Sequence, residues 1–324
     1  MTTAVKPLWV TWEKQIRNRS LSRALGAELH ELNCAGGRVK RYLTLAIRTI
    51  RIVSRSDAKL LFVQNPSLVL ALLANIVGRV TGKRVVVDSH NGGLLPLEGQ
   101  YRTLNLLANF IVRISPFTIV SNAALAEHVR RLGGRPLVLP DPLPDLPVLS
   151  VEQESDSVVF ICTWATDEPY RNVIDAAQTL ASNAKIYITG KPPAAILDTL
   201  GAIPDNVALT GYLDDHAFHN LLNRAAVIID LTTREDCLVC GAYESVALGK
   251  PMVLSGTEAL RAYFSQGAVF TDNSTSSIAD SIASALAQQS ELVSQVAALK
   301  VELLNSWQQQ FADMKQLLAA SSAD

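Results

Sequence analysis

Short runs of apolar and β-branched residues recur along the chain, and longer segments with apolar residues at helical spacing separate them. A short, uninterrupted apolar run is typical of a strand that is buried on both faces, as the strands of a parallel sheet are. The pattern predicts strands at residues 8–11, 27–32, 59–63, 84–88, 117–121, 137–139, 158–162, 186–189, 207–209, 227–231, 252–254 and 269–270. Because helical patterns fall between these strands, we expect an α/β fold with doubly wound parallel sheets.

A proline-rich segment at residues 140–147, PDPLPDLP, interrupts the alternation. Proline fixes φ and removes a backbone donor, so this segment is neither a helix nor a central strand, and we interpret it as a linker. A chain of 324 residues is long enough for two domains. We expect Rossmann-like domains at residues 1–145 and 146–290. A helical segment follows at residues 291–324, with Trp307 as a candidate break and a return to the N-terminal domain as one arrangement.

Composition is that of a globular protein, with 48% hydrophobic and 18% charged residues. The longest apolar run, residues 68–77, is too short to cross a bilayer, and the first residues lack an apolar signal segment. Four cysteines in a chain of this length are typical of a reducing compartment. Cys237 and Cys240 have metal-site spacing, but no second pair or nearby histidine completes a zinc site. We therefore expect a cytoplasmic protein without a metal site.

The net charge of −1 hides a division between the two halves of the chain. Residues 1–140 carry 20 Lys and Arg against 7 Asp and Glu, whereas the remainder of the chain is acidic. The basic half predicts an anionic partner. Attraction between the two halves across a cleft also explains the division, and both explanations can hold together. Nucleic acid is not expected, because no basic strand with interleaved aromatic residues and no reading helix is present.

Residues 38–55 mix apolar and basic residues at helical spacing, and Arg41, Arg48 and Arg51 contribute to the basic side. A helix of this kind can lie on an anionic membrane surface. The same pattern is equally typical of an ordinary helix that covers a sheet. The sequence leaves both interpretations open.

Residues 225–255 predict a strand, a polar turn, a helix and a second strand, which together form a βαβ unit. Gly241 lies just ahead of the predicted helix, whose free N–H groups would face an anion such as a phosphate. Glu244 is expected in the first turn, where its carboxylate could accept hydrogen bonds from a vicinal diol such as a ribose. The alternative is a glutamate that only complements the helix dipole.

The sequence DSHNGG, residues 88–93, lies at the carboxyl end of the strand predicted at residues 84–88, and open α/β sheets bind their ligands at the carboxyl ends of strands. Asp88 and His90 are the candidates for a base that accepts a proton from a sugar hydroxyl. An ionised carboxylate is ready to act at neutral pH, so the sequence favours Asp88, with His90 contacting a sugar. A structural histidine is the alternative.

Further cations follow other predicted strands or turns. Lys191, next to Gly190, and the arginines Arg171 and Arg234 could stabilise the charge that develops on a departing diphosphate. A Gly-Lys pair alone is weak support for that function. The ordinary interpretation of the sequence TWATDEP is that it caps a helix starting near Tyr170, where the helix dipole favours Asp167 and Glu168.

The spacing Asp236-x7-Glu244, followed by GKPMVLS, resembles the nucleotide-sugar motif of GT-B glycosyltransferases, especially glycosyltransferase family 4. The family usually has glutamate at the first of these positions, and here Asp236, or Glu235 shifted by one residue, takes its place. The resemblance implies two Rossmann-like domains facing across a cleft. It also implies that Asp236, Gly241 and Glu244 contact the donor, with Glu244 on the ribose.

Three motifs also resemble the family of β-1,4-mannosyltransferases that extend chitobiosyl-diphosphodolichol: DSHNGG, TWATDEP and ITGK. The segment IRNRS is similar to that family's Gly-Arg-Ser-Pro-Arg, which implies acceptor contacts for Arg17 and Arg19, with Asn91 nearby in the cleft. The chain is also similar to bacterial exopolysaccharide glycosyltransferases. These likenesses imply a lipid-diphosphate-linked glycan as the acceptor.

We therefore expect a glycosyltransferase that moves a sugar from a nucleotide-sugar donor to a lipid-linked acceptor, peripheral on the inner face of the plasma membrane. No Asp-x-Asp pair follows a predicted strand, so no cofactor or essential metal is expected. The family 4 motif favours retention of configuration, whereas the mannosyltransferase motifs favour inversion, which we prefer slightly. The alternative is a non-catalytic subunit that binds a nucleotide sugar or a membrane and activates a partner.

Overall fold

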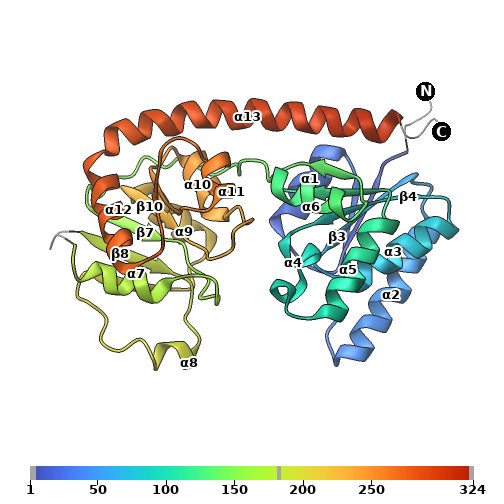
Figure 1. The fold of residues 1–324 in the computed structure, drawn as a ribbon, viewed down its shortest axis with the longest axis horizontal. Coiled ribbons are helices and arrows are strands. Elements are labelled where there is room, and N and C mark those ends of the chain that lie inside the picture. The colour runs from blue at the N-terminus through green and yellow to red at the C-terminus, as the bar shows by residue number, and fades with distance from the viewer. Residues whose placement is uncertain (1–4, 181–183, 321–324) are drawn as a thin grey trace. The chain divides into compact units, whose positions relative to one another are not determined.

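The computed structural model describes residues 5–180 and 184–320. Contacts divide the chain into two units, Met1–Pro142 with Gln309–Asp324, and Leu143–Gln308 (Figure 1). Each unit contains one six-stranded parallel sheet, so the predicted fold class is confirmed. The predicted strands are all present, with ends that shift by about two residues at most.

The sheet of the first unit has the order β2-β1-β3-β4-β5-β6. The strands are β1 (Leu8–Thr11), β2 (Glu28–Glu31), β3 (Leu60–Asn65), β4 (Arg84–Ser89), β5 (Phe117–Val120) and β6 (Pro136–Val138). The helices are α1 (Ile16–Leu25), α2 (Arg38–Arg55), α3 (Leu68–Val80), α4 (Asn91–Leu94), η1 (Pro96–Gly99), α5 (Arg102–Ile114) and α6 (Ala123–Arg131). The chain order reverses between β1 and β3, and ligands of open α/β sheets bind at such a switch point.

The core of the first unit forms because its central strands are apolar on both faces. Trp9 stacks on Phe62 at a centroid distance of 5.3 Å. Helix α3 packs on β3 and β4, and Gly78 permits the close approach, because a Cβ there would lie 2.4 Å from Cγ2 of Val85.

The sheet of the second unit has the order β12-β11-β10-β7-β8-β9. The strands are β7 (Ser157–Phe160), β8 (Lys185–Thr189), β9 (Val207–Gly211), β10 (Val227–Asp230), β11 (Met252–Ser255) and β12 (Ala268–Thr271). The helices are α7 (Tyr170–Ala177), α8 (Ala194–Leu197), α9 (Asp215–Arg224), α10 (Cys240–Leu248), α11 (Glu258–Tyr263), α12 (Thr275–Ala287) and α13 (Gln289–Ala320). Here the switch point lies between β7 and β10.

Helix α13 is continuous, so the candidate break near Trp307 is wrong (Figure 1). The helix contains no Gly or Pro, the residues that most often end or kink a helix. Val296 and Leu299 are buried in the core of the second unit. Met314 and Leu318 are also buried, and they belong to the first unit, where Arg84 donates a hydrogen bond of 3.0 Å to the carbonyl of Leu318.

Among residues 5–180 and 184–320, no helix combines the length and the hydropathy needed to cross a bilayer.

Candidate functional site

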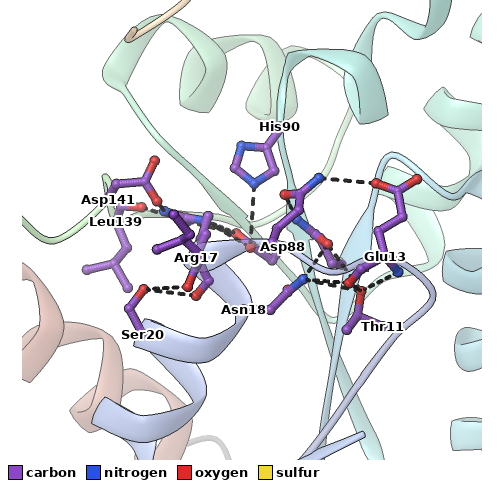
Figure 2. A network of polar contacts seen from close by, with 12 residues as sticks. Thr11, Glu13, Arg17, Asn18, Ser20, Asp88, His90, Leu139 and Asp141 are labelled. Carbon is purple, nitrogen blue, oxygen red and sulfur yellow. Dashed lines mark hydrogen bonds and ion pairs between the residues drawn. The ribbon is translucent and has the colours of Figure 1, made fainter. Parts of the chain in front are cut away.

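A buried polar cluster in the first unit lies where β1, β3 and β4 end, at the switch point of the sheet (Figure 2). Asn18 of α1 donates to Oε1 of Gln64 at 2.7 Å and accepts from the indole N–H of Trp9 at 3.0 Å. Thr11 also contacts Gln64, at 3.2 Å. These bonds hold the start of α1 against the carboxyl ends of β1 and β3.

Arg17 and Asp88 form a buried ion pair beside this cluster. Nε of Arg17 donates to Oδ2 of Asp88 at 2.9 Å, and Nη2 donates to Oδ1 at 2.8 Å. Burial opposes ionisation of Asp88, but the charge and hydrogen bonds of Arg17 outweigh it and hold the pKa of the carboxyl below its ordinary value. Asp88 is therefore a permanent carboxylate that is fully enclosed.

Arg17 uses its remaining groups within the protein as well. Its Nη2 donates to the carbonyl of Leu139 at 2.9 Å, and its Nη1 donates to Oδ1 of Asp141 at 2.8 Å. Burial acts to lower the pKa of Arg17, but Asp88 and Asp141 together raise it above the ordinary value. The sequence suggested an acceptor contact for Arg17, whereas the structure places it as the group that positions Asp88.

His90 lies directly after β4, with its side chain 31% exposed and its Nε2 atom 3.9 Å from Oδ2 of Asp88. Figure 2 shows the Nε2 edge of the ring directed at that carboxylate. This buried Nε2 atom has no hydrogen-bond partner among the described residues. Burial lowers the pKa of His90 although Asp88 acts to raise it, so the ring is neutral at pH 7. A proton on Nε2 would face Asp88 and leave Nδ1 as the proton acceptor.

The other candidates of the first unit are placed differently. Arg19 pairs with Glu31 at 2.9 Å and is 54% exposed. Asn91 is the first residue of α4 and is partly exposed next to His90. Gly93 is required by packing, because a Cβ there would lie 2.8 Å from the backbone oxygen of Asn65. The structure therefore brings Arg17, Asp88, His90 and Asn91 to one place and directs Arg19 to a separate ion pair.

In the second unit, the loop after β7 is organised by Glu168. Its carboxylate accepts from the backbone N–H groups of Thr163 at 3.0 Å and Ala165 at 2.8 Å. The indole of Trp164, a residue with φ of 63°, donates to the carbonyl of Thr189 at 3.0 Å. The expectation that Glu168 favours the start of α7 is therefore wrong, because the carboxylate turns back on its own loop.

Asp167 links this loop to the one that follows β10, across the switch point. Its Oδ2 accepts from the hydroxyl of Thr232 at 2.8 Å, and its Oδ1 lies 3.2 Å from Nη2 of Arg234. The same carboxylate is therefore not a cap of α7, contrary to expectation. Arg234 remains 43% exposed at the carboxyl edge of the sheet.

Two polar residues that the sequence did not single out extend this network. Oγ of Ser255 accepts from the N–H of Thr232 at 2.9 Å and donates to Oδ1 of Asn273 at 2.8 Å. Nδ2 of Asn273 returns to the carbonyl of Thr232 at 3.1 Å. Both residues lie at or just after a strand end, and this position is the signal that could have identified them.

Gly190 and Lys191 follow β8 at the same edge. Gly190 has φ of 75°, and a Cβ there would lie 2.3 Å from the carbonyl oxygen of Cys162, so the backbone requires glycine. Lys191 is exposed. Arg171 of α7 donates to the carbonyl of Thr199 at 2.8 Å. Lys191 therefore remains a candidate for a diphosphate, while Arg171 contacts the segment after α8.

Helix α10 starts at Cys240, two residues earlier than expected, so Glu244 lies in the second turn and not in the first. The early start occurs because Oδ2 of Asp230, at the end of β10, accepts from the N–H of Gly241 at 2.7 Å. Burial raises the pKa of Asp230 well above its ordinary value. Asp230 thus occupies one of the N–H groups that were expected to face a phosphate. No local sequence pattern signals this contact.

Glu244 is mostly buried, and burial raises the pKa of its carboxyl to about 7. Its Oε2 atom has no hydrogen-bond partner among the described residues. Buried carboxylate oxygens normally have a hydrogen-bond partner within the protein. A buried oxygen without one is typical of a site that binds a polar ligand. Asp236 lies between β10 and α10 and is partly exposed.

Among the described residues, no group of three or more His, Cys, Asp or Glu side chains is arranged to hold a metal ion. That no essential metal is needed stays a prediction.

Comparison with known proteins identifies the fold. No family model matches the chain, and no curated protein matches it. The structure of Anabaena Alr3699/HepE in complex with UDP and glucose matches with a TM-score of 0.72 at 13% identity, over 95% of this chain and 91% of that one. Sucrose-phosphate synthase from Thermosynechococcus elongatus matches with a TM-score of 0.75 at 12% identity, over 98% and 99%.

A protein from Listeria monocytogenes described as a UDP-N-acetylglucosamine 2-epimerase matches with a TM-score of 0.64 at 11% identity, over 91% of both chains. At these identities the likeness concerns the fold alone. The predicted GT-B fold, with two Rossmann-like domains, is confirmed.

Proposed function

We propose that this chain is a glycosyltransferase that moves a sugar from a nucleotide-sugar donor to a lipid-diphosphate-linked glycan in polysaccharide or glycoconjugate biosynthesis. The observation that carries the proposal is the arrangement of Arg17, Asp88 and His90 at a switch point. Transfer to a hydroxyl needs a group that accepts its proton, and His90 suits that function. The likeness to one protein, Anabaena Alr3699/HepE, solved with UDP and with UDP-glucose, supports a nucleotide sugar as the donor.

In the proposed reaction, His90 takes the proton of the acceptor hydroxyl on Nδ1. The hydroxyl oxygen forms a bond to the anomeric carbon as the bond from that carbon to the diphosphate breaks. Asp88 stays ionised and stabilises the imidazolium, as the carboxylate of a Ser-His-Asp triad does. We assign the base to His90 in place of Asp88, because Asp88 is fully enclosed and held by Arg17.

The second unit is proposed to hold the donor at the carboxyl edge of its sheet. The unpaired carboxylate of Glu244 would bind the ribose hydroxyls, and Lys191 and Arg234 would stabilise the charge that develops on the departing diphosphate. The N–H groups at the start of α10 other than that of Gly241 would add to this effect. Asp236 is proposed to contact the sugar.

Inversion of configuration is proposed, because a direct displacement is the mechanism that needs a base for the attacking hydroxyl. Neither a metal nor a cofactor is included in the proposal, since cationic side chains and helix N–H groups can stabilise the diphosphate. NMR of the anomeric proton of the product would test the stereochemistry, and a retained configuration would overturn it.

The chain is further proposed to work in the cytoplasm, at the inner face of the membrane that carries the acceptor. The excess of basic residues in residues 1–140 supports an anionic surface as the partner.

One observation favours a non-catalytic nucleotide-sugar-binding subunit as a second candidate. Asp230 occupies the N–H of Gly241, so α10 offers fewer free donors to a phosphate than expected. That candidate would bind nucleotide without transferring a sugar.

The experiment is turnover by the purified chain with a panel of nucleotide sugars and a membrane lipid extract. His90→Ala is expected to lower kcat by about 10²–10⁴-fold while nucleotide binding persists. His30→Ala is the matched control, because His30 pairs with Glu28 in β2, outside the Arg17–Asp88–His90 group. Nucleotide binding without turnover by the unaltered chain would favour the second candidate, and an active His90→Ala variant would remove His90 from the mechanism.

A further inference from the structure

Helix α2 leaves a row of apolar side chains uncovered. Val39, Leu43, Ile47 and Ile50 are 74%, 60%, 48% and 40% exposed. Their spacing of three or four residues places them on one side of the helix. The fold does not need this row, because a different side of α2, with Leu45 and Val53, supplies the buried contacts.

The neighbouring helices α3 and α5 also carry exposed apolar side chains. Helix α3 contacts both α2 and α5, and the three are visible in Figure 1. On α3, Ile76 and Val80 are 53% and 82% exposed, and on α5, Leu106 and Phe110 are 59% and 50% exposed. Three adjacent helices therefore present apolar rows to solvent, and clustered apolar exposure of this kind marks an interaction surface.

The charges on these helices all have one sign. Helices α2, α3 and α5 together contain nine Lys and Arg residues and no Asp or Glu. On α2, Lys40 lies one turn before Leu43, and Arg51 lies one turn after Ile47, so cations border the apolar row. A face that is both apolar and uniformly cationic fits a surface that offers acyl chains and phosphates together.

We propose that the outer face of α2, α3 and α5 binds the surface of an anionic lipid bilayer. The apolar rows would enter the boundary between headgroups and acyl chains, and the basic residues would lie among the phosphates. A second copy of the chain is a poorer occupant, because two faces with nine cations each repel one another. The inference rests on the proposed function, in which a lipid carries the acceptor, and it names the surface that meets that lipid.

The test is flotation of the full chain with vesicles of phosphatidylcholine alone and of phosphatidylcholine with phosphatidylglycerol. Binding is expected only to the anionic vesicles and is expected to weaken steeply with salt. The double variant Leu43→Gln/Ile47→Gln should lower the partition coefficient at least tenfold, and so should Lys40→Gln/Arg51→Gln. The matched control is Val301→Gln/Leu304→Gln, since both residues are exposed on α13 within the second unit. It should bind as the unaltered chain does.

No binding to anionic vesicles, or equal loss in the control variant, would overturn the proposal. A dimer that Leu43→Gln/Ile47→Gln dissociates would assign the face to a second copy. Transfer to a lipid-diphosphate-linked acceptor dispersed in detergent, without vesicle binding, would refute this surface and leave the proposed function standing. Vesicle binding without any transfer would support this surface and count against the proposed function.

Discussion

Asp88 shows how one partner decides the charge of a buried side chain. Removal from water favours the neutral acid, yet the bidentate contact with Arg17 keeps the carboxylate ionised. The charge is therefore available to His90 across the whole physiological pH range. When His90 takes a proton, the carboxylate of Asp88 stabilises the imidazolium. The ring is therefore more basic than the same buried histidine would be without that carboxylate.

Breaking this pair on one side is expected to be costly. Arg17→Leu should lower the free energy of unfolding by about 3–5 kcal/mol, because it leaves the buried carboxylate of Asp88 without its cation. Asp88→Asn should lower it by less, since Arg17 keeps its ion pair with Asp141. The double variant should lose less than the sum of the two. Urea unfolding of the four proteins measures the coupling, and strictly additive losses would contradict it.

The Arg17–Asp88 pair also predicts how the free energy of unfolding changes at low pH. The folded pKa of Asp88 lies below its ordinary value, so its stabilisation is fully present above the unfolded pKa, near 4. The stabilisation is lost as the pH falls through the folded pKa. The loss of stability below about pH 4 should therefore be shallower in Asp88→Asn than in the unaltered chain.

For Glu244, the contribution to the free energy of unfolding is expected to change with pH in the opposite direction. Its folded pKa of about 7 is higher than its unfolded value, so its contribution is fully present at low pH and is lost as the pH rises through about 7. Glu244→Gln should therefore raise the free energy of unfolding at pH 8 by about 2 kcal/mol and change it little at pH 5. Nucleotide affinity should fall in the same variant by about 1–3 kcal/mol. Calorimetry that shows unchanged affinity would separate Glu244 from the ribose.

The sequence singled out Asp88 and His90 as candidates because they lie at the carboxyl end of a strand, and the ends of strands are readable from hydrophobic periodicity. It did not identify the relation of Arg17 to Asp88, which joins residues 71 positions apart. Asp230 was missed for the same reason. Pairings of this kind depend on tertiary packing, and one sequence contains no local signal for them.

At the scale of elements, strands were predicted well and helix starts less well. A buried parallel strand is a contiguous apolar run, whereas a helix start depends on which group satisfies its first N–H donors. Asp230 accepts a hydrogen bond from the N–H of Gly241, and α10 begins two residues earlier than expected. The carboxylate of Glu168 accepts hydrogen bonds from N–H groups of its own loop and, among the described residues, from none at the start of α7. The motif TWATDEP thus forms a loop whose backbone N–H groups are held by the carboxylate of Glu168.

Replacing that carboxylate should loosen the loop. Glu168→Gln is expected to lower the free energy of unfolding by about 1–3 kcal/mol, because the amide cannot accept on both sides. Hydrogen exchange at the amides of Thr163 and Ala165 should accelerate. Glu152→Gln, at an exposed residue, is the control and should change neither quantity. Unaltered exchange in Glu168→Gln would refute the function of this carboxylate.

At the scale of the whole molecule, the two units differ in how the chain builds them. The second unit is one continuous segment, whereas the first is completed by Gln309–Asp324. The buried side chains of Met314 and Leu318 supply apolar contact, and the bond from Arg84 fixes the last turns of α13. The helical periodicity of this segment was readable from the sequence. The continuity of α13 past Trp307 became clear only in the structure.

Met314→Ala and Leu318→Ala should each destabilise the first unit by about 2–5 kcal/mol, the usual cost of a buried cavity. Leu317→Ala is the matched control, because Leu317 is 53% exposed, and it should have little effect. Hydrogen exchange resolved by peptide should show faster exchange in β3 and β4 and no change in β10 and β11. A uniform effect on both units would contradict the division.

The discontinuous first unit also has a consequence for synthesis on the ribosome. Pro142 emerges long before Gln309, because all of Leu143–Gln308 is translated between them. The first unit must therefore wait, with the site for Met314 and Leu318 uncovered, while the second unit is made and can fold by itself. Completion of the first unit therefore comes after translation of the whole second unit. A pause or a chaperone during translation would act on the first unit, the one that contains Asp88 and His90.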